Sequence, residues 1–189
     1  MNPSCNPRRA FTLIETVIII AFSVSVMIAL VLLMYIFTKS STYEQAIATS
    51  SGSATLVMRE IELYTLPADA FVLSHTFPGA ATYTSTTTSL VLELPSIDSS
   101  GYVIANTYDY VAFYATGTMA YRIIDKNALS NRATGTKALS SNISSFTFTY
   151  NNSVIPNATT TTVDVQTQTT VRQQTYTDHR REQIRLRNY

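Results

Sequence analysis

One carboxylate, Glu15, lies at the N-terminal edge of a long apolar run, and its position alone makes it the first candidate for a specific function. The residues from Thr16 through Thr38 contain no charge, proline or glycine. An unpaired carboxylate in such surroundings is costly, because the charged form loses its hydration. Glu15 therefore either marks the headgroup boundary of an ordinary anchor or neutralises a cation during assembly. Intramembrane carboxylates are usually functional, and the basic residues Arg8 and Arg9 just before it favour the second interpretation.

A group of arginines near the C-terminus is the second candidate for chemistry. It consists of Arg172, Arg180, Arg181, Arg185 and Arg187. On one predicted hairpin, these guanidinium groups could bind an acidic partner subunit or DNA phosphate. The alternative is a solvated face whose charges protect an edge strand from aggregation. The acidic residues Asp164, Asp178 and Glu182 are near enough in sequence to pair with the arginines, which favours the alternative.

Motifs typical of enzymes are missing from the sequence. It contains no G-x-S-x-G, no Walker phosphate-binding loop, no CxxC and no HExxH. His75 and His179 are far apart along the chain, and we expect isolated surface histidines rather than a metal pair. The sequence therefore predicts a protein that is not an enzyme and has no cofactor, no metal and no catalytic residues.

The apolar run has the length of a membrane span. Its core, Val17 to Phe37, has 21 residues and would form a helix roughly 31 Å long, about the thickness of the hydrocarbon layer. Arg8 and Arg9 precede it without any acidic residue, so the positive-inside rule places the N-terminus in the cytoplasm and the remainder outside. A cleavable secretory signal is the rival interpretation, but the run is too long for one.

The residues around Glu15 resemble a known processing site. The segment Arg9-Ala10-Phe11-Thr12-Leu13-Ile14-Glu15 is similar to the site at which type IV pilins and the pseudopilins of type II secretion are processed. The resemblance implies that a prepilin peptidase removes the leader before Phe11 and that the new Phe11 amine is methylated. It also implies that Glu15, then the fifth residue, pairs with the N-terminal amine of a neighbouring subunit.

Two departures from the family pattern refine this expectation. Ala10 stands where the family usually has glycine, but it is small, and we still expect cleavage between Ala10 and Phe11. Leu32 stands where many major pilins have a kinking proline, which favours a minor pilin or pseudopilin. Cys5 lies in the leader, so the processed chain would have no cysteine and no disulfide. Without Arg8 and Arg9 the formal charge changes from +1 to −1, and nothing overall indicates nucleic-acid binding.

The rest of the chain predicts an α+β fold. One long helix is expected from Thr12 to Leu66 and ends before Pro67, with Gly52 as its weak point. Ser41 and Glu44 have capping-box spacing, which would begin a separate helix or be absorbed in a continuous one. Strands are expected where apolar and polar residues alternate, namely at 89–94, 108–115, 118–124, 145–150, 161–172 and 183–187. The amphipathic half of the helix should cover the apolar face of this antiparallel sheet.

The predicted organisation is a leader (1–10), a transmembrane or filament-core helix (11–38), an amphipathic half-helix (39–66) and a β-rich head (67–189). With the resemblance, this describes a structural subunit that waits in the cytoplasmic membrane and is then extracted into a filament. Its expected partners are other pilin or pseudopilin subunits and the prepilin peptidase, and nucleic acid is a less favoured one. The rival is a permanently anchored extracytoplasmic binding protein with a β-rich head. Pilus, secretion pseudopilus and DNA-uptake apparatus stay open as the destination.

Overall fold

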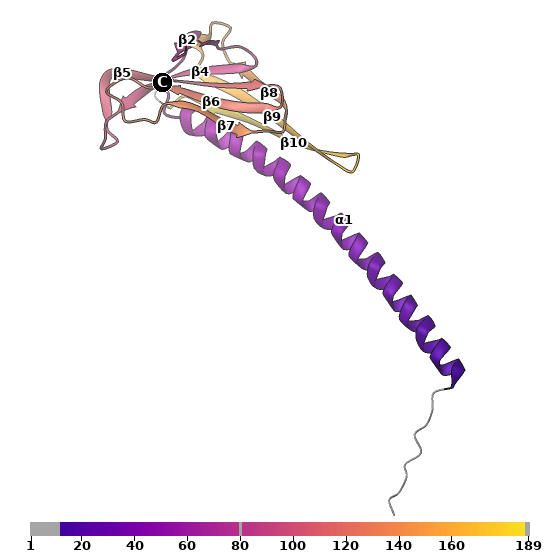
Figure 1. Ribbon diagram of the computed structural model, residues 1–189. Helices are drawn as coiled ribbons and strands as arrows, with labels where there is room; N and C mark the ends of the chain where they lie inside the picture. The colour runs from indigo at the N-terminus through magenta and orange to yellow at the C-terminus, as the bar shows by residue number, and fades with distance from the viewer. Residues whose placement is uncertain (1–11, 80, 188–189) are drawn as a thin grey trace, which may run out of the picture. The chain divides into compact units, whose positions relative to one another are not determined.

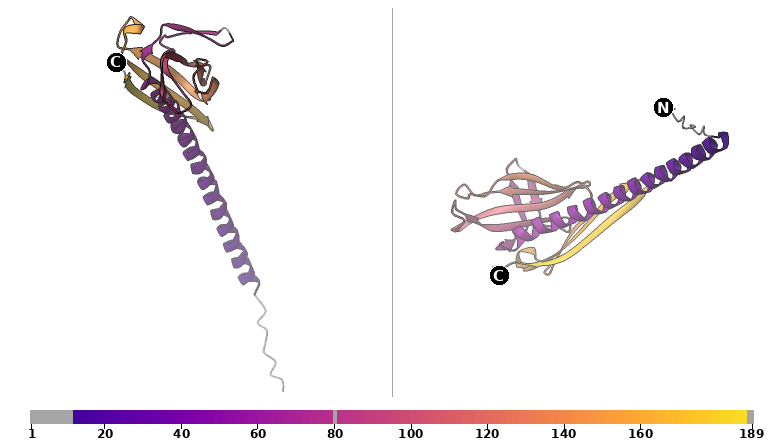
Figure 2. Two further views of the ribbon diagram at one scale, coloured as in Figure 1. Left: turned by 90° about the vertical axis from the view of Figure 1, so that its left-hand side faces the viewer. Right: turned by 90° about the horizontal axis from the view of Figure 1, so that it is seen from below.

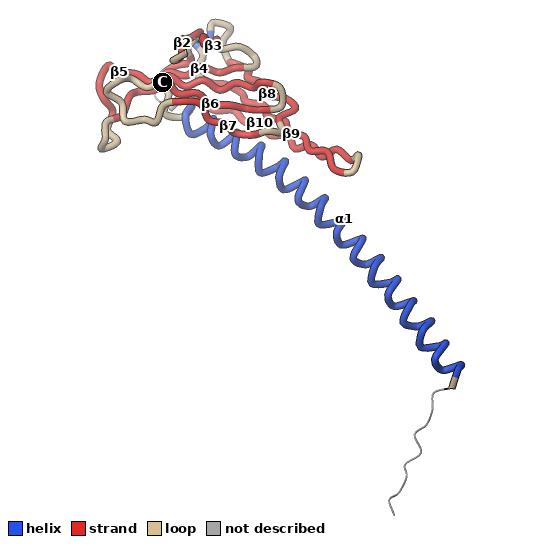
Figure 3. The backbone as a smooth tube through the Cα atoms, in the orientation of Figure 1, coloured by secondary structure: helices blue, strands red, loops and turns tan. Residues whose placement is uncertain are grey.

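A computed structural model describes residues 12–79 and 81–187 and divides the chain into two compact units, Met1–Glu44 and Gln45–Tyr189. The helix α1, Leu13–Thr65, belongs to both units and is continuous over 53 residues (Figures 1 and 3). The prediction of one helix from Thr12 to Leu66 is confirmed. The α1 backbone continues through Ser41 and Glu44, so their capping-box spacing is not used to begin a helix.

The part of α1 in the first unit has the properties of a membrane span. By length and composition it could cross a membrane, and none of its apolar segment is buried against the rest of the chain. Several of its hydroxyl groups bond within the helix: the Ser25 hydroxyl donates to the Ala21 carbonyl oxygen at 2.9 Å, and the Thr42 hydroxyl donates to the Thr38 carbonyl oxygen at 2.7 Å. Such back-bonding allows polar side chains to remain in an apolar medium.

The second unit contains α1 residues from Gln45 onward and three antiparallel sheets. The five-stranded sheet has the order β1 (Ala70–Phe71), β4 (Ser89–Ile97), β5 (Val103–Thr116), β6 (Met119–Asp125) and β7 (Gly135–Ser140). The three-stranded sheet has the order β10 (Gln174–Arg185), β9 (Thr160–Val171) and β8 (Ile143–Tyr150). The hairpin β2 (Ser74–Phe77) and β3 (Ala81–Thr84) forms the third, and a short 3₁₀ helix spans Ile155–Asn157.

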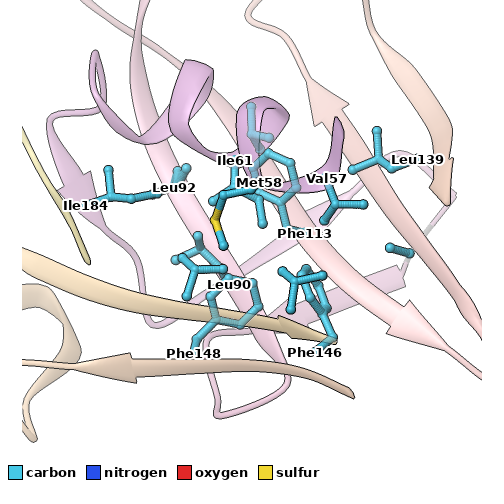
Figure 4. Packing of buried hydrophobic residues seen from close by; sticks show 14 of the residues in the cluster. Val57, Met58, Ile61, Leu90, Leu92, Phe113, Leu139, Phe146, Phe148 and Ile184 are labelled. Atoms are coloured by element: carbon cyan, nitrogen blue, oxygen red, sulfur yellow. The ribbon is translucent and has the colours of Figure 1, made fainter. Parts of the chain in front are cut away.

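The C-terminal half of α1 packs on the apolar faces of both larger sheets (Figure 4). Its buried residues recur every three or four positions, which is one face of a helix: Ala46, Ser50, Ala54, Val57, Met58, Ile61 and Thr65. Ile47 is 51% exposed, because it lies one position away from this face. The expectation that an amphipathic half-helix covers the sheet is confirmed.

Two polar contacts fix α1 on the sheets. The buried Ser50 hydroxyl lies 2.8 Å from the Thr167 hydroxyl, which also donates to the Ser50 carbonyl oxygen at 2.9 Å. Further along, Glu60 accepts hydrogen bonds from Arg122 of β6, at 2.7 Å, and from Lys137 of β7. These pairs set the register of the helix against β9, β6 and β7, which apolar packing by itself specifies less sharply.

Two details of the five-stranded sheet differ from the prediction. Strand β4 continues through Pro95 instead of ending there, because β1 pairs with β4 only at Leu92 and Glu93. On that open side a missing N–H breaks no ladder bond. The β5–β6 turn consists of Gly117 and Thr118, one residue later than expected, and Gly117 supplies the positive φ of 60° that the first position of such a turn requires.

The alternation of residues in 118–124 does not decide which of them face α1, and the register of the β5–β6 hairpin does. Val111 lies opposite Ile124 and Phe113 lies opposite Arg122, so Ala120 and Ile124 share the face that contacts α1. Tyr121 and Ile123 point to the other face, where Ile123 packs with Phe77 of the β2–β3 hairpin and Tyr121 stacks on Tyr114.

Tyr150 provides a prediction about stability at alkaline pH. Burial raises the pKa of its phenol from 10.0 to about 12, and the hydroxyl donates to the Ser89 carbonyl oxygen at 3.1 Å. The folded state holds the proton more tightly than the unfolded state, so this contribution to stability is complete below pH 10 and is lost as pH rises to about 12. For each such group, the free energy of unfolding should fall by about 1.4 kcal/mol per pH unit in this window. Denaturant unfolding between these pH values should show that the free energy of unfolding of Tyr150→Phe falls less steeply with pH than that of the wild type. An equal slope in the two proteins would contradict the raised pKa of Tyr150.

Candidate functional site at the helix N-terminus

Glu15 lies in the first turn of α1, where two features of the helix favour a carboxylate. Thr12 is the residue before the helix, and its hydroxyl oxygen accepts a hydrogen bond from the Glu15 N–H at 3.4 Å. The Thr16 N–H donates to the Thr12 carbonyl oxygen at 3.2 Å. Thr12 and Glu15 therefore have capping-box spacing, and the positive end of the helix dipole favours the negative charge. The sequence contained this Thr-x-x-Glu signal, which we had assigned only to Ser41 and Glu44.

The surroundings of Glu15 are apolar and open. Leu13, Ile14 and Ile18 are 85%, 69% and 62% exposed. Within residues 12–79 and 81–187, no cation forms a salt bridge with the Glu15 carboxylate. Any counter-charge for Glu15 therefore lies outside the described residues. The predicted cleavage and methylation residues, Ala10 and Phe11, also lie outside the described residues.

The five arginines lie on one hairpin but do not form one cluster. Strands β9 and β10 pair along their whole length, and Arg172 and Gln173 form the turn with φ values of 48° and 67°. Side chains alternate along a strand, so Arg180 lies on the face of the buried Ile184, while Arg181 and Arg185 lie on the opposite face.

Among the five arginines, Arg180 has a carboxylate partner within the described residues. Arg180 donates to Asp178 and to the Ser51 hydroxyl of α1, both at 3.2 Å. Asp164 lies opposite Arg181 in the ladder but bonds to His179 Nε2 at 2.8 Å instead. The predicted pairing with nearby carboxylates is thus observed for Arg180 only, among the described residues.

Both histidines have carboxylate partners, so neither is isolated as we had expected. His75 Nε2 lies 2.8 Å from Asp125 Oδ2, and its ring stacks on Tyr110 with centroids 3.8 Å apart. In turn, the Tyr110 hydroxyl donates to Glu93 at 2.9 Å, and burial together with this bond raises the Tyr110 pKa to about 12. In the part of the chain that the structure describes, no group of three or more metal-ligating side chains gathers in one place.

Asp109 is the most deeply buried charged group among the described residues of the head, and no sequence motif marks it. Its carboxylate is fully buried and accepts hydrogen bonds from the Ser96 hydroxyl at 2.9 Å, the Ser130 hydroxyl at 2.7 Å, the Asn127 N–H at 2.8 Å and Arg132 at 2.8 Å. These donors come mainly from the β6–β7 loop. Asp109 therefore holds that loop to the end of the sheet, and its role is structural.

Comparison with known proteins assigns no family to the chain. No protein-family model, no curated protein and no solved structure matches the chain.

Proposed function

We propose that this chain is a non-enzymatic structural subunit, a minor pilin or pseudopilin, of a type IV pilus-like or type II secretion filament. The observation that carries the proposal is the position of Glu15. Its backbone is held in the first turn of an exposed apolar helix, and no cation within the described residues neutralises its side chain. A free amine on Phe11 of a neighbouring subunit would supply the missing charge.

The physical argument concerns how apolar helices find a register. A helix that leaves lipid for the side of another apolar helix gains little hydrophobic free energy, since both surroundings are apolar. An ammonium and a carboxylate that are each costly in a low dielectric offset much of that cost when they pair. One pair between subunits would therefore fix the axial position of each helix within the filament.

The location follows from the same segment. The helix α1 is long and apolar enough to span a membrane, which fits a single-pass membrane protein. We place the N-terminus in the cytoplasm and the β-rich head outside, with transfer to a pilus or pseudopilus after processing. The partners are then other pilin or pseudopilin subunits and the prepilin peptidase.

A permanently anchored binding protein is the second candidate, and an aromatic row on the head favours it. On the sheet face away from α1, the rings of Tyr83 and Tyr114 lie 4.4 Å apart, and those of Tyr114 and Tyr121 stack at 5.4 Å. These rings are half-buried, and aromatic surfaces of this kind are common in ligand sites. This candidate requires no processing of the leader and no role for Glu15.

The N-terminus of the mature protein distinguishes the two. The experiment is the intact mass and N-terminal peptide of protein purified from membranes that contain the peptidase. We expect an N-methylated chain that begins at Phe11, and the same start in an Ala10→Gly control. A wild-type chain that still begins at Met1 while the control is cleaved would show that Ala10 blocks processing. The anchored binding protein would then replace the pilin proposal.

A further inference from the structure

Strand β10 has a free edge that faces an open groove. In the described part of the chain β10 pairs only with β9, so its other edge has no neighbouring strand. Figure 2 shows β10, in yellow, beside the α1 residues of the head. One cavity of about 460 Å³ is lined by Arg59 and Glu62 of α1 and by β10 residues 180–182. A second, of about 310 Å³, is lined by α1 residues that include Ile47 and by β10 residues 176–178.

Both cavities lie along the backbone edge of β10. Successive side chains of a strand point to opposite faces, so a cavity lined by three consecutive residues must reach the edge of the strand. The two runs, 176–178 and 180–182, are separated by one residue. Together they form what we call the β10 groove, which extends about 20 Å along the strand at the usual rise per residue.

The backbone groups that point into the groove are those of odd-numbered residues. The Leu186 N–H donates to the Thr159 carbonyl oxygen at 2.9 Å, in the same register that pairs Arg185 with Thr160. Hydrogen-bonding direction alternates along an antiparallel strand, so even-numbered residues bond to β9 and odd-numbered residues point away from it. The Arg187 N–H agrees, since it donates to the Leu66 carbonyl oxygen at 3.1 Å rather than to β9.

Upstream of Arg187 this outward series has no partner. Among the described residues, no backbone bond covers the outward groups of Thr177, His179 and Arg181. Unpaired N–H and C=O groups in a row are the template to which an extended peptide adds as a further strand.

The charges along the groove select the chemistry of such a peptide. Arg181 and Arg185 share the outer face of β10. The carboxylate opposite Arg181 on β9, Asp164, is bonded to His179 instead. Neither Arg181 nor Arg185 has an ion pair within the described residues, and the same holds for Arg59 on the α1 side. On the inner face Asp178 already neutralises Arg180, and Glu182 there and Glu62 of α1 add carboxylates, so the attraction for an acidic strand comes from the outer face. An added strand with carboxylates on its outer face would pair with Arg181 and Arg185, whereas a basic strand would be repelled.

We propose that the β10 edge is a docking site for an extended acidic segment of another protein, which adds to the three-stranded sheet as its fourth strand. The site is independent of leader processing and of Glu15, so it can stand or fall separately from the filament proposal. It predicts a partner with Asp or Glu at alternate positions of a β-forming stretch. Arginines that would otherwise only protect the edge from aggregation then serve as recognition groups.

The test uses the full chain in detergent micelles and a peptide as long as residues 176–182, made of alternating threonine and glutamate. A peptide of alternating threonine and lysine is the matched control. We expect binding of the acidic peptide only. Hydrogen exchange should show new protection at the outward amides of Thr177, His179 and Arg181, while the amides that already bond to β9 change little.

Two variants separate backbone pairing from charge. Thr177→Pro removes an outward N–H that makes no ladder bond, so the β9–β10 pairing should persist. Hydrogen exchange checks this, because the amides that bond β10 to β9 should stay protected. This variant should lose peptide binding, and Thr177→Ala should retain it. Arg181→Glu should weaken binding by about tenfold or more.

Three outcomes would overturn the proposal. The first is the absence of both binding and protection, which would leave the arginines as guards of a free edge. The second is equal binding of the lysine peptide. The third is protection of the outward amides that appears without peptide and increases with protein concentration. This result would assign the edge to a second copy of this chain.

Discussion

Glu15→Leu is expected to leave the protein in the membrane but remove it from filaments. Leucine makes the span more apolar, so insertion should not suffer. A neighbour's N-terminal ammonium would then lie in a low dielectric without a counter-charge, and breaking such a pair is strongly destabilising. We expect the amount of this subunit in sheared filaments to fall by about a hundredfold, measured against its amount in the membrane fraction.

The matched control keeps the shape of the side chain. Glu15→Gln retains the polar atoms but not the charge, and it should fail in the same assay if ion pairing is the cause. Cleavage before Phe11 should be the same in both variants, as read by mass. Normal incorporation of Glu15→Leu would remove the assembly role and leave Glu15 as a boundary residue of an anchor.

Asp109→Asn is expected to cause the largest loss of stability in the head. The substitution leaves Arg132, which is 15% exposed, without its counter-charge, and presents an amide to a site that supplies four donors. Removing one partner of a buried pair costs about 3–5 kcal/mol. In detergent, the thermal midpoint of the head should fall by roughly 10 °C, monitored by near-ultraviolet circular dichroism.

A half-buried aspartate without an ion pair among the described residues provides the control for this measurement. Asp98 accepts hydrogen bonds from the N–H groups of Ser100 and Tyr102 within one turn, which asparagine can also accept. Asp98→Asn should therefore cost less than about 1 kcal/mol. Equal losses for the two variants would show that Asp109 has no special role in holding the β6–β7 loop.

The helix and the regular strands could be predicted from the sequence because their signals are local. The apolar run and Pro67 delimit α1. Strict alternation marks β8, where Phe146 and Phe148 are buried and Thr147 between them is half-exposed. Each of these patterns repeats with the period of one element, so no knowledge of the partner element is required.

The first nine residues of β10 lacked such a signal. The run from Gln174 to Glu182 contains no aliphatic residue, and it is a strand because β9 supplies a complementary backbone along its whole length. Pro95 was read as a strand end because the sequence does not show that β1 stops short of it.

Glu15 and its apolar surroundings could be read from the chain alone, because the cost of a carboxylate in such a segment depends on nearby residue types. The separation of Arg180 from Arg181 and Arg185 and the burial of Asp109 among Ser96, Ser130 and Arg132 required the tertiary structure. The open edge of β10 required it as well. These features depend on which strands lie beside each other, and contacts between residues far apart in sequence leave no periodic trace in the sequence.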